Sequence, residues 1–159
     1  AQRSLSMINK NCEGRVPAHG AFSEADRALL ASVDAMLGQA RAAMDDFALH
    51  TILNTVWGLI GDTNRYFAGE EPWKLKKTDP QRMNTVLYVT AEALRQFALI
   101  TQPFMPNAAA KLLDLLAIPA EARDFAHLGP EHRLTPGTSL PAPTAIFPRF
   151  VEAEEGKGT

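Results

Sequence analysis

Hydrophobic residues recur at three- and four-residue spacing through most of this chain, the period of amphipathic α-helices. The pattern predicts helices over residues 1–12, 23–44, 46–69, 79–101 and 107–116. Consecutive helices of this kind joined by short connections usually pack side by side in opposite directions. We therefore predict an all-α fold, an antiparallel helical bundle.

Capping residues set the expected helix ends. Ser23 offers an N-cap for the second helix, and Asp45 or Asp46 for the third. Gly69 should end the third helix. Asp79 followed by proline is a strong start signal for the fourth, because proline fits the first helical position.

The pattern changes at Pro119, after which prolines and glycines are frequent. Such residues favour extended and turn structure over helix. We expect residues 1–118 to form the bundle and residues 119–159 to form an extended C-terminal arm packed on it. The last residues, EAEEGKGT, are polar enough to be disordered. Since residue 1 already reads as helix interior, we expect the chain to be a piece of a longer protein.

The composition is that of an ordinary soluble domain, with 159 residues, 46% hydrophobic and 21% charged. Cys12 is the only cysteine, and no apolar run approaches the roughly 18 residues that span a membrane. These features favour a cytoplasmic protein with no membrane association. The net charge of −2 argues against indiscriminate nucleic-acid binding, although a local basic patch can still bind a specific RNA site.

Residues that carry catalysis or bind metals are scattered. Glu-x-x-His does not occur, and Asp46 and His50, spaced to share a helix face, are more typical of a surface contact than of a metal site. Cys12 has no activating partner nearby in the sequence and is expected to be a buried thiol. We predict no catalytic residue, no metal and no cofactor in this chain.

The stretch EEPWKLKK is unusual because a tryptophan follows a proline in an expected solvent-facing connection. Its neighbours are three lysines: Lys74, Lys76 and Lys77. Trp73 could pack on Tyr66 or Phe67 as a lid on the bundle. Alternatively, it could stack on an unpaired nucleic-acid base while the lysines contact phosphates. The residue pattern alone does not decide between these interpretations.

Several motifs in order carry a family resemblance. They are Asn64-Arg-Tyr66, Glu71-Pro72-Trp73-Lys74-Leu75, Asp79 with Arg82, Val86-Leu87-Tyr88, Glu92-Ala-Leu94-Arg95 and Pro103-Phe104-Met105-Pro106. The set resembles the anticodon-binding domain of bacterial methionyl-tRNA synthetases, which are class I aminoacyl-tRNA synthetases. The opening residues resemble the family's Asn-Leu-x-x-Arg helix, and Leu134-x-x-Gly137 and Ile146-Phe147-Pro148-Arg149 resemble its closing segment. The resemblance covers nearly the whole chain.

The resemblance implies roles for individual residues. Trp73 would stack on an anticodon base and Arg3 would contact anticodon bases. Candidate phosphate contacts are Lys74, Lys76, Lys77 and Arg65, and candidate supporting residues are Asn64, Tyr66 and Pro72. The asparagine of the first motif should lie four residues before Arg3, outside this chain. Arg95 and Arg149 are candidate structural ion-pair partners, for example of Glu92 or of the acidic tail.

The resemblance also implies a function for the parent protein, which would join methionine to its tRNA using ATP. ATP would bind in a catalytic domain absent from this chain, so the fragment alone would be inactive. The implied partners are a methionine-accepting tRNA and the catalytic domain of the same parent, which would be a monomer.

Two alternatives remain open. Related class I synthetases for isoleucine, leucine, valine and cysteine share the helical anticodon domain. The chain could also be a helical protein-interaction domain that docks through Trp73 and the apolar segment around Ile146 and Phe147.

Overall fold

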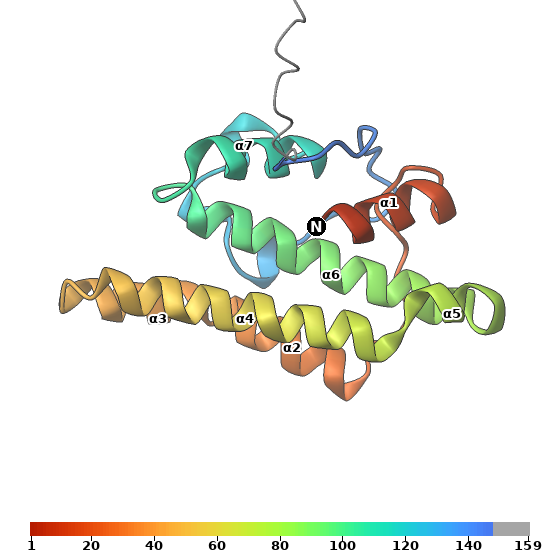
Figure 1. Ribbon diagram of the computed structural model, residues 1–159, viewed down its shortest axis with the longest axis horizontal. Helices are drawn as coiled ribbons and strands as arrows, with labels where there is room; N and C mark the ends of the chain where they lie inside the picture. The colour runs from red at the N-terminus through yellow and green to blue at the C-terminus, as the bar shows by residue number, and fades with distance from the viewer. Residues whose placement is uncertain (148–159) are drawn as a thin grey trace, which may run out of the picture.

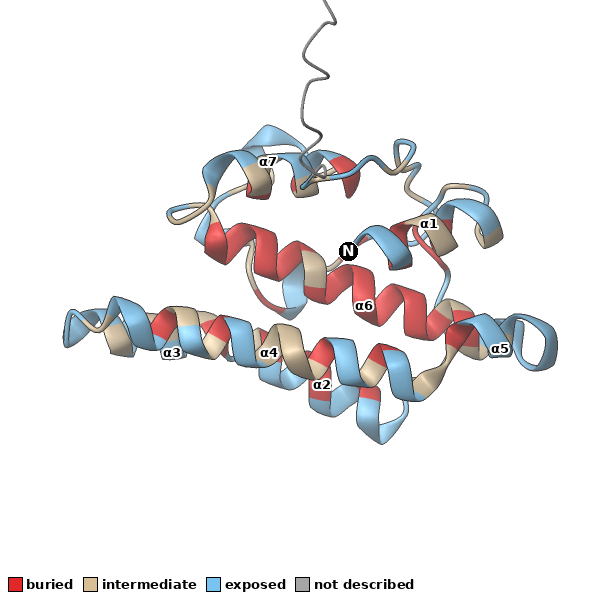
Figure 2. Ribbon diagram, in the orientation of Figure 1, coloured by how far each residue is buried: buried red, intermediate tan, exposed pale blue. Residues whose placement is uncertain are grey.

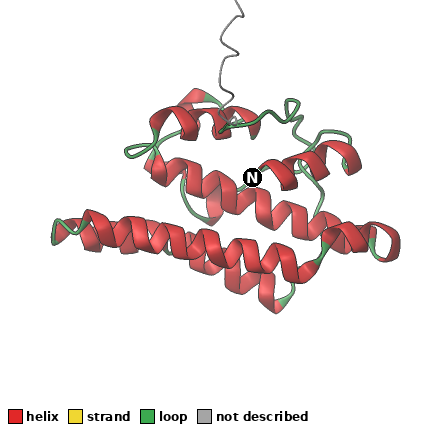
Figure 3. Ribbon diagram, in the orientation of Figure 1, coloured by secondary structure: helices red, strands yellow, loops and turns green. Residues whose placement is uncertain are grey.

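The structure, a computed structural model, describes residues 1–147 and is built from helices and connecting loops (Figure 3). Over this range the helices are α1 (Gln2–Asn11), α2 (Glu24–Asp34), α3 (Met36–Asp45), α4 (Leu49–Glu70), α5 (Pro72–Thr78), α6 (Pro80–Thr101) and α7 (Pro106–Leu115). Three short 3-10 turns follow, at Ala120–Ala122, Phe125–His127 and Pro130–His132. The predicted all-α fold is confirmed.

Helix α6 is the centre of the molecule. In Figure 1 it crosses the middle, with α2, α3 and α4 on one side and α1 and α7 on the other. It is therefore buried along almost its whole length, as Figure 2 shows, whereas α3 and α4 are exposed on their outer faces. Val86, Leu87, Val89 and Leu99 are among its fully buried side chains. A helix that is apolar on most sides needs such a position.

Two predicted helix boundaries are wrong. The expected helix over 23–44 is interrupted at Ala35, where α2 ends and α3 begins. Alanine is a strong helix former, so its residue type gives no signal of the break. The next helix begins at Leu49, because Phe47 has a left-handed backbone (φ 53°) that separates it from α3. Asp46 therefore lies after α3 rather than at the start of α4, and it does not share a helix face with His50.

Two predicted N-caps are confirmed. Ser23 accepts a hydrogen bond from the backbone N–H of Asp26, whose carboxylate accepts one from the backbone N–H of Ser23 in return. The Asp79 side chain accepts the backbone N–H of Arg82 at 2.9 Å, at the start of α6. These caps fix where α2 and α6 begin, since each satisfies N–H groups that have no partner within the helix.

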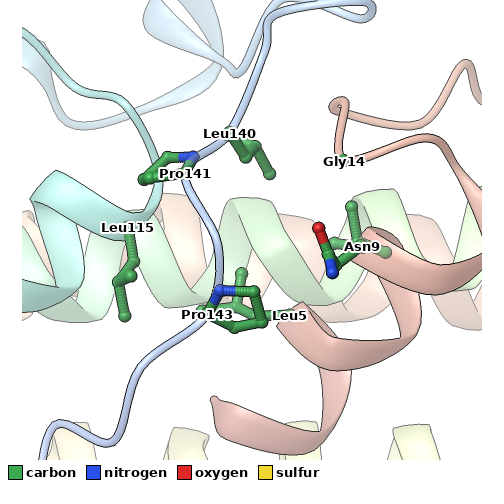
Figure 4. Close-up of a pocket in the computed structure, with 8 residues that line it drawn as sticks. Leu5, Asn9, Gly14, Leu115, Leu140, Pro141 and Pro143 are labelled. Carbon is green, nitrogen blue, oxygen red and sulfur yellow. The ribbon is translucent and has the colours of Figure 1, made fainter.

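The arm, as far as residue 147, lies against α1 and α6. Its backbone pairs with the loop after α1, where Val16 donates to the carbonyl of Thr138 at 2.8 Å and Leu140 donates to that of Gly14 at 2.7 Å. Figure 4 shows Pro143 of the arm beside Leu5 of α1; the space between the side chains here is too small for a water molecule. The arm thus braces the helix that carries Arg3. The expected disorder of the last residues and the predicted role of Arg149 concern residues outside the described range.

Candidate nucleic-acid interface

The corner between α4 and α5 determines where Trp73 lies. Glu71, the residue after α4, has a left-handed backbone (φ 45°, ψ 54°), and Pro72 follows as the first residue of α5. Proline is suited to that position because its φ is fixed near the helical value. The segment faces solvent as expected, but it is a seven-residue helix with Trp73 in its first turn instead of an irregular connection. The ring is thus carried by regular backbone whose direction is set by one sharp corner.

Trp73 has features of both interpretations of its role. Its ring lies 6.1 Å from that of Phe67 in a tilted arrangement, yet the residue remains 37% exposed. The Arg3 guanidinium of α1 lies over the indole ring, with Cζ 4.6 Å from the ring centroid. This geometry is that of a cation–π contact. The structure thus brings together the two residues that the family resemblance implied would read bases, although they are far apart in sequence.

The three lysines lie on the same short helix as Trp73 and are exposed. Lys74 forms an ion pair with Glu71 one turn earlier, with Nζ and Oε1 2.7 Å apart. Lys76 and Lys77 lie in the last turn of α5. The positive charge beside the tryptophan is therefore concentrated towards the end of this helix, because Glu71 neutralises part of the charge on Lys74.

The predicted supporting residues differ in their surroundings. Tyr66 donates a hydrogen bond from its hydroxyl to Oδ1 of Asp26 at 2.6 Å, so it ties α4 to α2 and does not contact α5 directly through this bond. Pro72 is buried at the corner. Arg65 is exposed and paired with Asp62 on the same helix, and Asn64 is exposed beside it. Their contacts with RNA stay predictions.

A buried polar network next to this corner was not predicted from the sequence. Asp26 is fully buried and accepts two hydrogen bonds from Arg82, at 2.5 and 2.9 Å. The same guanidinium contacts Oε2 of Glu70, the last residue of α4, at 2.8 Å. The start of α2, the end of α4 and the start of α6 therefore meet at Arg82.

The titration of these groups reflects the network. Burial alone would raise the pKa of the Asp26 carboxyl, but hydrogen bonds from Arg82, Tyr66 and the backbone of Ser23 hold the pKa below its ordinary value. Burial and the neighbouring Asp26 carboxylate raise the pKa of Tyr66. The hydrogen bonds to Asp26 and Glu70 raise the pKa of Arg82. The Asp26 carboxylate and the Arg82 guanidinium are therefore both charged at neutral pH.

An apolar groove of about 500 Å³ runs between α4, α6, α7 and the start of α1, where Ala1 and Gln2 line it but Arg3 does not. Trp57, which is 51% exposed, lines it together with Ile146 and Phe147, whereas Trp73 does not. The two tryptophans therefore belong to different surfaces. The protein-interaction alternative expected docking through both Trp73 and the segment around Ile146. In the structure these two features lie on different surfaces.

Other chemistry is limited in residues 1–147. Within this range no three metal-ligating side chains gather into a cluster, and none of the helices is long and apolar enough to cross a membrane. Cys12 is half-buried, and burial raises the pKa of its thiol, which disfavours the reactive thiolate. The corner between α4 and α5 with Trp73, here called the tryptophan corner, is the feature with the clearest binding chemistry.

The fold and this surface define an all-α domain with an exposed aromatic ring and neighbouring cations, a combination suited to unpaired RNA. Residues 16–157 match the family described as the anticodon binding domain of methionyl tRNA ligase. The chain belongs to this family. The match decides against the isoleucyl, leucyl, valyl and cysteinyl alternatives.

Individual relatives support the same family assignment. The chain is 60% identical over 155 residues to the methionine–tRNA ligase of Brucella suis biovar 1 (strain 1330), covering 98% of this chain and 30% of that protein. It is 48% identical over 162 residues to that of Mycobacterium tuberculosis (strain ATCC 25618 / H37Rv), covering 99% and 31%. The structure of the apo form of M. tuberculosis methionyl-tRNA synthetase matches with a TM-score of 0.90 at 48% identity, over 96% of this chain and 31% of that one. The chain thus spans about 30% of the length of these relatives.

Proposed function

We propose that this chain recognises the anticodon of a methionine-accepting tRNA for a parent ligase that joins methionine to that tRNA using ATP. The observation that carries the proposal is the partly exposed Trp73 ring with the Arg3 guanidinium over it, its Cζ 4.6 Å from the ring centroid. ATP and methionine would bind in a catalytic domain elsewhere in the same parent. The proposal extends to the parent acting as a monomer in the cytoplasm, where tRNA is charged.

Anticodon bases suit this surface because they are unpaired and can leave the RNA stack. An indole ring offers a broad apolar plane on which a base can stack. An arginine beside that ring adds planar donors suited to the hydrogen-bonding edges of bases. Lys76 and Lys77 on the same helix are exposed and supply positive charge for the flanking phosphates.

The ring is also held before the RNA arrives. Pro72 limits the backbone at the corner, and Phe67 contacts the ring from α4. A side chain that is already ordered loses less conformational entropy on binding. This arrangement supports a role for Trp73 in binding, and the same contact with Phe67 is what a structural lid would make.

Replacing the ring separates these roles. In the intact parent, Trp73→Ala should weaken binding of the methionine tRNA by about 1–3 kcal/mol, the usual range for one stacked base. The midpoint of thermal unfolding should hardly change, whereas loss of a core tryptophan removes about 3–5 kcal/mol of stability. Both quantities are measured on the same variant, by titration with tRNA and by calorimetry.

Trp57→Ala is the matched control, because Trp57 is also partly exposed but lines the separate apolar groove. It should leave discrimination between the methionine tRNA and an anticodon-altered copy unchanged. If Trp73→Ala lowers the unfolding midpoint steeply while the folded protein still discriminates between the two tRNAs, Trp73 is a structural lid and the proposal is wrong.

A further inference from the structure

One ion pair joins the residues on either side of helix α5, which carries Trp73. Glu70 is the last residue of α4, and Arg82 lies in the first turn of α6. Nη2 of Arg82 and Oε2 of Glu70 are 2.8 Å apart, and Nε of Arg82 donates to the same oxygen at 3.0 Å. The two residues are 12 positions apart, and the whole of α5 lies between them. Figure 1 shows α5 between the end of α4 and the start of α6, the two helix ends that this ion pair joins.

Arg82 is itself held in place from the interior. Its guanidinium donates to both carboxylate oxygens of Asp26, which is 0% exposed. Asp26 is fixed in turn by the Tyr66 hydroxyl at 2.6 Å and by the backbone N–H of Ser23 at 2.9 Å. A planar arginine fork bound to two acceptors in this way has little rotational freedom. Glu70 is thus tied to a rigid point.

The corner between the tied ends has a backbone that needs such restraint. Glu71 adopts a left-handed conformation, which is unfavourable for a residue with a side chain unless the surrounding structure enforces it. If the end of α4 were released, Glu71 could relax and α5 would tilt. Arg3 belongs to a different helix and would not follow. The 4.6 Å approach of Arg3 to the Trp73 ring therefore depends on the corner.

We propose that Arg82 and Glu70 are positioning residues for Trp73: they hold α5 so that the indole ring faces Arg3, and they act on RNA only through that ring. This inference rests on the proposed function, because it assigns a purpose to the orientation of Trp73. It gives the Asp26 network a role beyond stability. It also predicts that the network and the ring are energetically coupled.

The test is a double-mutant cycle in the intact parent, with Glu70→Ala, Trp73→Ala and the variant carrying both changes. Glu70→Ala removes the tie but leaves the buried Asp26–Arg82 pair, so folding should be retained. We expect it to reduce discrimination between the methionine tRNA and an anticodon-altered copy by about 3- to 10-fold. In the Trp73→Ala background the same change should have no further effect beyond about twofold, since coupled residues are not additive.

Two further variants sharpen the cycle. Glu70→Gln keeps an acceptor for Arg82 and should give an intermediate loss, and it takes over the test should Glu70→Ala fail to fold. Asp114→Ala breaks another ion pair of an arginine, that of Asp114 on α7 with Arg123 at 2.7 Å, and should leave discrimination unchanged. An effect of Asp114→Ala equal to that of Glu70→Ala would mean that loss of any such pair acts through stability, and would overturn the positioning role.

The remaining outcomes separate the two proposals. If Trp73→Ala weakens anticodon discrimination but Glu70→Ala does not, or if Glu70→Ala acts equally with and without the ring, the positioning role is wrong and the proposed function stands. If Trp73→Ala leaves discrimination unchanged, both are wrong. If Glu70→Ala reduces anticodon discrimination when Trp73 is present but not in the Trp73→Ala background, both proposals are supported.

Discussion

Two arginines on the central helix α6 form charged clusters with different surroundings. Arg95, which is 2% exposed, pairs with the fully buried Glu92 at 2.6 Å, as the sequence suggested. It also donates to the carbonyl of His127 at 2.6 Å, while Glu92 accepts the backbone N–H of Leu134 at 3.0 Å. This cluster fastens the arm to the core. Arg82, 20% exposed, instead joins the ends of α2 and α4 beside the tryptophan corner.

The two clusters show that arginine–carboxylate pairs can stabilise the fold in one place and orient a binding residue in another. The side chains of Arg95 and Glu92 are almost completely buried, and they hydrogen-bond to backbone groups of the arm. The arm held by this ion pair packs against α1. The Arg95–Glu92 pair therefore affects the position of Arg3 only indirectly, through the arm and α1. The Arg82 cluster includes Glu70, which directly precedes Glu71 at the corner between α4 and α5. A small shift of the backbone there would move Trp73. The depth of a charged cluster and the segment it holds therefore indicate its role better than its residue types do.

The largest effect should come from breaking the deep cluster. Arg95→Met leaves Glu92 charged and buried without a cation, which typically costs about 3–5 kcal/mol of stability. Urea unfolding of the chain followed by circular dichroism gives this free energy.

The double variant Glu92→Leu with Arg95→Met is the control. It leaves no isolated charge, so it should be less destabilised than Arg95→Met alone, although the N–H of Leu134 loses its acceptor. A loss below about 1 kcal/mol for Arg95→Met, the range of exposed ion pairs, would remove the distinction drawn here between the two clusters.

The same contrast explains what could be predicted from the sequence. Apolar periodicity predicted α1, α4, α6 and α7, because each buries apolar residues at three- and four-residue spacing. Helix α5 was missed, since seven residues with three lysines carry too little pattern. The Ser23 cap was predictable because it is local. The pairing of Asp26 with Arg82 joins residues 56 positions apart, and no periodicity reports such a contact. The family resemblance implied that Arg3 and Trp73 both contact anticodon bases, but the cation–π contact between them follows from the packing of α1 beside α5.

An intermediate effect is expected at Asp26, with a distinct pH dependence. Its folded-state pKa is depressed, so the stability it contributes is present above the ordinary aspartate pKa of about 3.9 and is lost as the pH falls through the folded value. Asp26→Asn should therefore be less stable by about 1–3 kcal/mol at neutral pH. The difference from the original chain should shrink below about pH 4.

Free energies of unfolding in urea, measured between about pH 3 and 7 for both proteins, test this expectation. Asp114→Asn serves as the comparison, because the Asp114 carboxylate on α7 is 65% exposed although it pairs with Arg123, so the change should alter neither the stability nor its pH dependence appreciably. A stability difference for Asp26→Asn that stays constant down to low pH would show that the carboxylate charge is not what holds α2, α4 and α6 together.

The smallest effect concerns the lysines of α5, the helix whose ends the Arg82 cluster holds. In the intact parent, replacing Lys76 or Lys77 with alanine should weaken the methionine tRNA and an anticodon-altered copy alike, since phosphates carry no sequence information. Each change should lower the dependence of log affinity on log salt concentration by up to about one unit. Lys74→Ala should lower it less, because Glu71 already neutralises that charge in part. Lys111→Ala on α7, the side of α6 where the arm lies, is the matched control and should leave the salt dependence unchanged. An unaltered slope for all three α5 lysines would make them ordinary solvated charges and confine the candidate interface to Trp73 and Arg3.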